Sequence, residues 1–198
     1  SPFGPGRPGW HIECCAIALH YLQPDSADDF AIDIQGGGSD LIFPHHEMSA
    51  AQSRSMTNQK FARTYVHTGM IGLNGEKMSK SLGNLVFVSK LIASGVSPAA
   101  IRWALMQHPY AEDLMWTDGL LDLASIAIER LQLNLARMEV APTDSVIQEI
   151  IDALSSNLDT PRAIEAITRW MQETESGKSG GVAGELGRAL DSLLGLTL

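Results

Sequence analysis

The hydrophobic positions in the first part of the chain follow two different spacings. From Trp10 to Leu22 apolar residues recur every three or four positions, which predicts a helix. A second helix is expected from Pro44 to about Met56, because proline is favoured in the first turn of a helix. Alternating or short apolar runs predict strands at residues 30–34, 65–67 and 70–73. Residues 1–95 are therefore expected to form a mixed α/β part.

Two glycine-containing segments interrupt this pattern. Gly36, Gly37 and Gly38 are expected to end the first strand. Asn74-Gly75 is typical of a tight hairpin turn, because both residues tolerate a positive φ.

From residue 88 onward the spacing is helical throughout. Ser97-Pro98 places an N-cap residue before a proline at the first helical position, which predicts a helix to about Gln107. Further helices are expected at residues 88–93, at 117–140, from 143, from 160 to about 174, and before 194. Residues 96–198 are therefore expected to form an all-helical bundle.

The composition narrows the class of protein. The chain has 14 Lys+Arg and 23 Asp+Glu, and its net charge of −9 disfavours a large nucleic-acid footprint. No apolar run approaches the roughly 20 residues that span a bilayer, and the start has no signal-peptide core, so no membrane contact is expected. The two cysteines are adjacent and make poor disulfide partners, which favours a reducing, cytoplasmic setting.

One candidate site combines a thiol with histidines. Cys14 lies on the first expected helix, and His45 and His46 lie at the start of the second. A thiolate and an imidazole are typical zinc ligands, but two are too few, so a substrate atom or residues outside the chain would complete the site. Helix-capping histidines are the alternative. Cys15 is expected to be a small core residue.

The glycine triplet forms a second candidate site. Glycines let a backbone approach a ligand closely, with amide groups free to meet a phosphate or a ribose. Asp40 could accept hydrogen bonds from ribose hydroxyls. A tight strand-to-helix turn explains the triplet equally well.

A third candidate site is the segment from Lys77 to Asn84. Two lysines three residues apart, separated by serine and closed by Gly83-Asn84, form a cationic loop that could stabilise transferring phosphates. The spacing is not that of a Walker loop. An ordinary solvated turn is the alternative.

Together these segments resemble a known family. Lys77-Met78-Ser79-Lys80-Ser81 matches the KMSKS signature of class I aminoacyl-tRNA synthetases. The segments 6–14 and 36–47 resemble the cysteine-activating branch, which comprises cysteinyl-tRNA synthetase and the cysteine ligase of mycothiol biosynthesis. The resemblance implies that residues 1–95 are the second half of a Rossmann-type catalytic domain and that 96–198 are the helical bundle behind it.

Several details resemble the ligase more than the synthetase. Ser49 stands where the synthetase has a zinc-binding glutamate, and Gln35 stands where it has histidine. The chain also ends without an anticodon-reading domain, so tRNA is not expected as a partner. The family's upstream half carries a His-Ile-Gly-His motif and another zinc cysteine, neither of which occurs here. The chain is therefore expected to be the C-terminal half of the enzyme and to be inactive alone. A surface loop is expected between residues 18 and 30, because this stretch is longer than in the family.

The resemblance implies an ATP-dependent ligase. In the first step ATP, with Mg²⁺, would activate L-cysteine as cysteinyl-adenylate and release pyrophosphate. In the second step the amine of glucosaminyl-inositol would accept the cysteinyl group and release AMP. One zinc ion would be bound by Cys14 and His45. Trp10 would pack over the bound cysteine. The nucleotide would be bound by Gly36, Gly37, Gly38, Ser39, Asp40 and the Ile71 backbone. The phosphates would be bound by Lys77, Met78, Ser79, Lys80 and Ser81, of which Lys77 and Lys80 would be catalytic.

Two alternatives to the ligase stay open at this point. One is a fragment of cysteinyl-tRNA synthetase that lacks the anticodon-binding domain. The other is a non-catalytic zinc-binding module, against which the intact lysine loop argues, because a scaffold does not need a cationic phosphate clamp.

Overall fold

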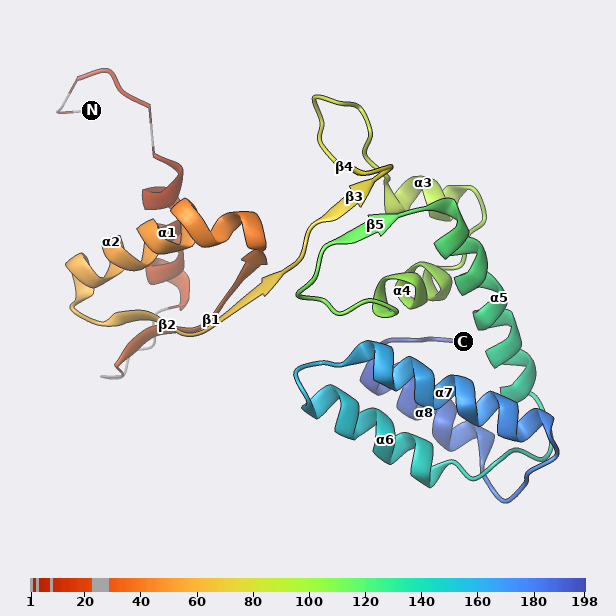
Figure 1. Ribbon diagram of the computed structural model, residues 1–198. Coiled ribbons are helices and arrows are strands. Elements are labelled where there is room, and N and C mark those ends of the chain that lie inside the picture. Colours follow the sequence, from red (N-terminus) through yellow and green to blue (C-terminus); the bar gives the residue numbers. More distant parts are fainter. Residues whose placement is uncertain (1, 3, 8, 23–28) are drawn as a thin grey trace. The chain divides into compact units, whose positions relative to one another are not determined.

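The computed structural model describes residues 2, 4–7, 9–22 and 29–198 (Figure 1). It forms two compact units, residues 1–70 and 71–198. The division falls after Met70 because β3 (Ile71–Leu73) pairs with β5 (Leu114–Trp116) within the second unit. The domain boundary expected after residue 95 stays a prediction. Of the expected surface loop between residues 18 and 30, residues 23–28 lie outside the described residues, and residues 18–22 are helical.

The first unit is a parallel β–α–β arrangement with one additional helix. Its elements are α1 (Trp10–Leu22), β1 (Phe30–Gly38), η1 (Ser39–Leu41), η2 (Ile42–His46), α2 (Glu47–Thr57) and β2 (Lys60–Thr68). β1 and β2 pair in parallel from Phe30 opposite Lys60 to Gly38 opposite Thr68. A small apolar core lies between this sheet and the helices, made by Ala18, Leu19, Ala31, Ile32, Ala50, Phe61 and Ala62. The predicted first helix is confirmed with its bounds.

One further prediction for this unit is wrong in detail, and another is confirmed. The glycine triplet does not end the first strand, because all three glycines continue β1 and pair with Val66, His67 and Thr68. Phe43 has an extended backbone, with φ −135° and ψ 135°, so the helical path starts after it, at Pro44. This path continues through His46 into α2, which ends at Thr57, and therefore agrees with the helix predicted from Pro44 to about Met56.

The second unit combines a small sheet with helices. Its elements after β3 are β4 (Glu76–Lys77), α3 (Val88–Ala93), α4 (Pro98–Met106), β5, α5 (Asp118–Leu135), α6 (Asp144–Ser155), α7 (Thr160–Glu175) and α8 (Ala183–Leu194). β3 and β4 form the predicted hairpin, in which Asn74 and Gly75 both have positive φ. The Ser97 hydroxyl accepts a hydrogen bond from the Ala99 amide and caps α4 as predicted. β5 could not be predicted from the sequence, because its three residues are too few to show a period.

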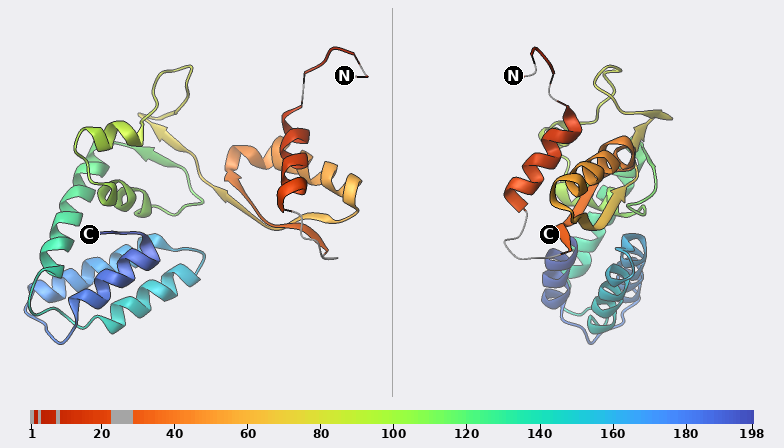
Figure 2. Two further views of the ribbon diagram at one scale, coloured as in Figure 1. Left: turned by 180° about the vertical axis from the view of Figure 1, so that it is seen from behind. Right: turned by 90° about the vertical axis from the view of Figure 1, so that its left-hand side faces the viewer.

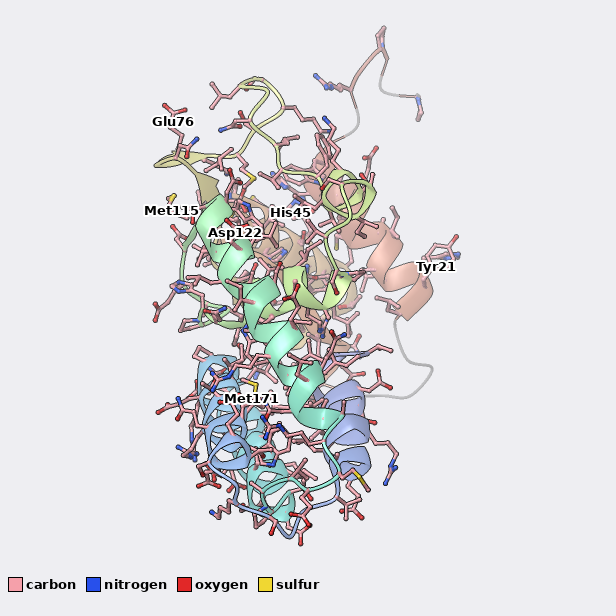
Figure 3. All side chains as sticks on the ribbon, turned by 90° about the vertical axis from the view of Figure 1, so that its right-hand side faces the viewer. Tyr21, His45, Glu76, Met115, Asp122 and Met171 are labelled. Carbon is pink, nitrogen blue, oxygen red and sulfur yellow. The ribbon has the colours of Figure 1, made fainter. Side chains whose placement is uncertain are left out.

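The helices of the second unit enclose one core. α6 packs against α7 and α8, and α5 contacts both α7 and α8 (Figures 1 and 2). The largest fully buried side chains include Trp103, Leu131, Ile150, Ile167, Met171, Leu186 and Leu190, and Figure 3 labels Met171 among them. α5 ends at Leu135, before its expected end at Val140, and Val140 instead forms a bridge with Gly181. Among the described residues, no helix combines the length and the apolarity needed to cross a membrane.

An ion pair with an unusually acidic carboxylate links α5 to the end of α7. Arg130 donates through Nε to Glu175 Oε1 at 2.7 Å and through Nη2 to Oε2 at 2.5 Å, and Asn134 Nδ2 donates to Oε1 at 2.9 Å. These hydrogen bonds, the one from Arg130 above all, lower the pKa of Glu175 from 4.5 to about 2. The carboxylate therefore stabilises the folded state in its charged form.

Replacing Glu175 by glutamine is expected to lower the free energy of unfolding at pH 7 by about 1 kcal/mol. Both side chains are about one-third exposed, so solvent screening reduces the effect. Because the folded-state pKa is depressed, this stabilisation is present above pH 4.5 and is lost as the pH falls towards about 2. Chemical denaturation between pH 7 and pH 2 measures the difference. Glu165→Gln, at an exposed position of the same helix, should change stability little at any pH, and an equal loss in both variants would contradict the prediction.

Candidate functional site

The expected site residues fall into the two units. Trp10, Cys14, the segment 36–40 and His45 lie in the first unit, whereas Ile71 and the segment 77–81 lie in the second.

The start of α1 meets η2 through three aromatic side chains. The ring of Trp10 stacks on that of His45, with centroids 4.2 Å apart and planes inclined by 25°. His11 Nδ1 and His45 Nδ1 are 2.8 Å apart, so one ring donates a hydrogen bond to the other. His45 is 6% exposed and Trp10 57%, so Trp10 covers the imidazole and still presents surface to a ligand. Figure 3 labels His45.

Cys14 lies on the same side of α1 as these contacts. Residues three and four positions apart are neighbours on a helix, which places Cys14 beside Trp10 and His11. Its thiol is free and partly exposed, whereas Cys15 is fully buried and its pKa is raised by burial. Cys14 is therefore the cysteine of this pair that is accessible to a metal or substrate.

The histidines of η2 are held in the neutral form. Burial lowers the pKa of His45, and the nearby His11 lowers it further. Burial, then His67 and then His45, lower the pKa of His46. A neutral imidazole is the form that binds a metal ion. The donor set of Cys14 and His45, on helical segments that contact each other, therefore fits zinc in its chemistry.

The described residues provide part of a metal site at most. Among the residues that the structure describes, no group of three or more His, Cys, Asp or Glu side chains could hold an ion. Ser49 is buried and its hydroxyl donates to the His45 carbonyl at 2.8 Å, so it serves the backbone of η2 and α2. The remaining ligands of a zinc ion would have to come from outside the described residues.

His46 belongs to a hydrogen-bonded chain that crosses the sheet. Gln35 Nε2 donates to His46 Nε2 at 2.9 Å, so the proton of the neutral ring lies on Nδ1, which donates to His67 Nε2 at 2.7 Å. Sequence analysis left the role of His46 open and did not single out His67. His67 lies opposite Gly37 in the parallel register of β1 and β2, a pairing that no local sequence pattern shows.

Two of the three glycines are required by close side chains. A Cβ on Gly37 would lie 2.9 Å from Cε1 of His46, and a Cβ on Gly38 would lie 2.7 Å from Oδ1 of Asp40. The nearest atom to a Cβ on Gly36 would be the Val66 carbonyl oxygen at 3.8 Å, an ordinary contact. Packing against the protein's own side chains therefore accounts for Gly37 and Gly38. Nucleotide binding by residues 36–40 stays a prediction.

The lysine loop begins at the end of the β3–β4 hairpin. Lys77 is the last residue of β4, and Met78 is partly buried against the core of the second unit. Lys80 is exposed in the turn that follows. Ile71, in β3, is 38% exposed and pairs with Leu114 of β5. The loop is thus anchored at its start and exposed at its tip.

Comparisons with known proteins extend this picture. The model of the tRNA synthetases class I (C) catalytic domain matches residues 1–126. The chain is 49% identical over 201 residues to an L-cysteine:1D-myo-inositol 2-amino-2-deoxy-alpha-D-glucopyranoside ligase of Streptomyces avermitilis, a match that covers 100% of this chain and 48% of the relative. It is 52% identical over 203 residues to the ligase of that name from Rhodococcus erythropolis, with 100% and 47% covered. The chain thus spans about half the length of these curated relatives.

A solved structure is similar in fold. It is the LeuRS of Agrobacterium radiobacter K84 in a ternary complex with tRNA and LeuAMS. The TM-score is 0.65 at 18% sequence identity, and the match covers 84% of this chain and 26% of the other. At this identity the similarity concerns the fold alone.

Proposed function

The chain belongs to the family of class I (C) tRNA synthetase catalytic domains, and from this membership we propose that it is part of an ATP-dependent cysteine ligase. The proposed enzyme joins L-cysteine to the amine of glucosaminyl-inositol. The observation that carries the proposal is the identity of 49–52% with ligases of this name along the whole chain. The parallel β1–α2–β2 arrangement supports the reading of residues 1–95 as half of a Rossmann-type domain, followed by a helical bundle.

The proposed reaction has two steps. The cysteine carboxylate attacks the α-phosphate of ATP, which gives cysteinyl-adenylate and releases pyrophosphate. The amine then attacks the activated carbonyl, which forms the amide and releases AMP. Lys77 and Lys80 would stabilise the charge that builds on the phosphate oxygens, with Mg²⁺ accompanying ATP. The segment 36–40 and the Ile71 backbone would hold the ribose and the adenine.

In the first unit, Cys14 and His45 would select the amino acid. Zinc bound by Cys14 and His45 would supply a ligand position that prefers the thiolate of cysteine to the hydroxyl of serine. His45 is held in place by stacking with Trp10, and its pKa is lowered by burial, so it is ready to bind without first losing a proton. The exposed surface of Trp10 would pack against the bound cysteine. ATP and a free thiol suit a reducing, cytoplasmic setting.

The second candidate is a truncated cysteinyl-tRNA synthetase, and the match to the model of the class I (C) tRNA synthetase catalytic domain favours it. The charge of the helical part argues against it. Residues 96–198 contain 7 Lys+Arg and 15 Asp+Glu, so this part lacks the excess of positive charge that holds nucleic-acid phosphates.

The acceptor separates the two candidates. The chain, extended to the full length of its relatives, is assayed for cysteine-dependent ATP–pyrophosphate exchange and then for cysteinyl transfer to glucosaminyl-inositol or to tRNA. We expect exchange and transfer to the amino sugar. Charging of tRNA without transfer to the amino sugar would overturn the ligase in favour of the synthetase.

A further inference from the structure

The side chain of Asn84 closes the lysine loop from its far end. Asn84 Oδ1 accepts a hydrogen bond from the Ser79 amide at 2.8 Å, and Asn84 Nδ2 donates to the Lys77 carbonyl at 3.3 Å. One amide group thus uses both its acceptor and a donor to bridge the start of the loop to its end. Asparagine suits this place because its planar side chain carries the two functions side by side.

A smaller turn lies inside this bridge. The Ser79 hydroxyl accepts from the Leu82 amide at 3.2 Å and lies 3.1 Å from the Ser81 hydroxyl. The Gly83 amide donates to the Lys80 carbonyl at 3.3 Å, and Gly83 has a φ of 67°, a value that favours glycine. Lys80 therefore lies inside a closed turn whose ends Asn84 holds together.

The base of the loop is held by packing. Lys77 pairs with Gly72 of β3, and Met78 packs on the core. A Cβ on Gly72 would lie 2.5 Å from the sulfur of Met115 and 2.8 Å from the carbonyl oxygen of Glu76, so glycine allows the Met115 side chain and the β4 backbone to lie close to β3. Figure 3 labels Met115 and Glu76 in this region. With the base fixed in this way, the path of residues 79–83 depends on the hydrogen bonds that close the loop.

We propose that Asn84 is a positioning residue for adenylate formation, acting through the backbone of Lys77 and Ser79 on the two lysines. This inference rests on the proposed function. A loop that is already closed loses less conformational entropy when its lysines meet the phosphates, and groups held in place stabilise charge better than mobile ones. Asn84 itself touches neither cysteine nor ATP in this assignment.

Kinetics of the full-length enzyme test the role. Asn84→Ala is expected to lower kcat for ATP–pyrophosphate exchange by about 10- to 100-fold, with the KM for ATP within about threefold and the melting temperature unchanged. The effect should be less than additive with that of Lys80→Ala, because Asn84 acts through the lysines. Leu82→Ala, at an exposed position of the same loop, should behave as wild type. Additive losses, or a wild-type kcat for Asn84→Ala, would overturn the proposal.

Hydrogen exchange tests the bridge without any activity. In the 198-residue chain, Asn84→Ala should speed exchange of the Ser79 amide by about tenfold, while the Ala100 amide at the start of α4 serves as an unchanged reference. An unchanged Ser79 rate would overturn the role of Asn84 even in an active enzyme. Absence of cysteine-dependent exchange in the full-length wild type would instead overturn the proposed function, so the two failures are distinct.

Discussion

Replacing Lys80 by alanine is expected to lower kcat for cysteine-dependent ATP–pyrophosphate exchange by about two to three orders of magnitude. Negative charge builds on the phosphate oxygens mainly as pyrophosphate leaves. An ammonium group that contacts these oxygens at that stage therefore affects kcat more than it affects the binding of ATP. The KM for ATP should therefore stay within about threefold. Lys80 is exposed in the loop, so its removal should not disturb the core of the second unit.

Steady-state exchange assays of the full-length enzyme measure this effect. Lys90→Ala is the matched control, because Lys90 is an exposed lysine of the same unit that lies over the ring of Phe87 at 5.2 Å. It should leave kcat unchanged. Lys80→Arg keeps the charge and should retain more activity than Lys80→Ala. An equal loss in the Lys80 and Lys90 variants, or a loss confined to KM, would contradict the role assigned to the loop.

The parts of the fold that local sequence determines could be predicted. The helix from Trp10 to Leu22 and the helix at 88–93 have the expected bounds. The Asn74-Gly75 hairpin and the Ser97 cap are confirmed as well, because each depends on backbone preferences of adjacent residues. Features set by distant partners could not be predicted in this way. β5 pairs with β3, which lies about 40 residues earlier in the chain, and Val140, which was expected to be helical, instead pairs with Gly181.

The residues of the candidate site also differ in whether the local sequence identifies them. Cys14, His45 and the lysine loop stand out as residue types and as a motif, so the sequence points to them directly. The glycine triplet was expected to end the first strand but continues it, because its pairing with β2 exists only in the folded chain. His67 and the bridging role of Asn84 were missed for the same reason, since each depends on a hydrogen bond that no local pattern encodes.

Loss of the Cys14 thiol should remove most of the metal from the full-length enzyme. Zinc in Cys14→Ala is expected to fall from about one ion per chain to less than about 0.2 after dialysis, because a thiolate is the strongest of the proposed ligands. Elemental analysis measures the ratio. The adjacent Cys15→Ala is a matched control, since Cys15 is fully buried and its thiol has a raised pKa from burial, so its metal content should stay near one. His45→Gln should resemble Cys14→Ala, because the stacked imidazole beside Cys14 is the second proposed ligand. An equal zinc content in the Cys14 and Cys15 variants would show that Cys14 does not bind the ion. The selection of cysteine through its thiol would then need another explanation.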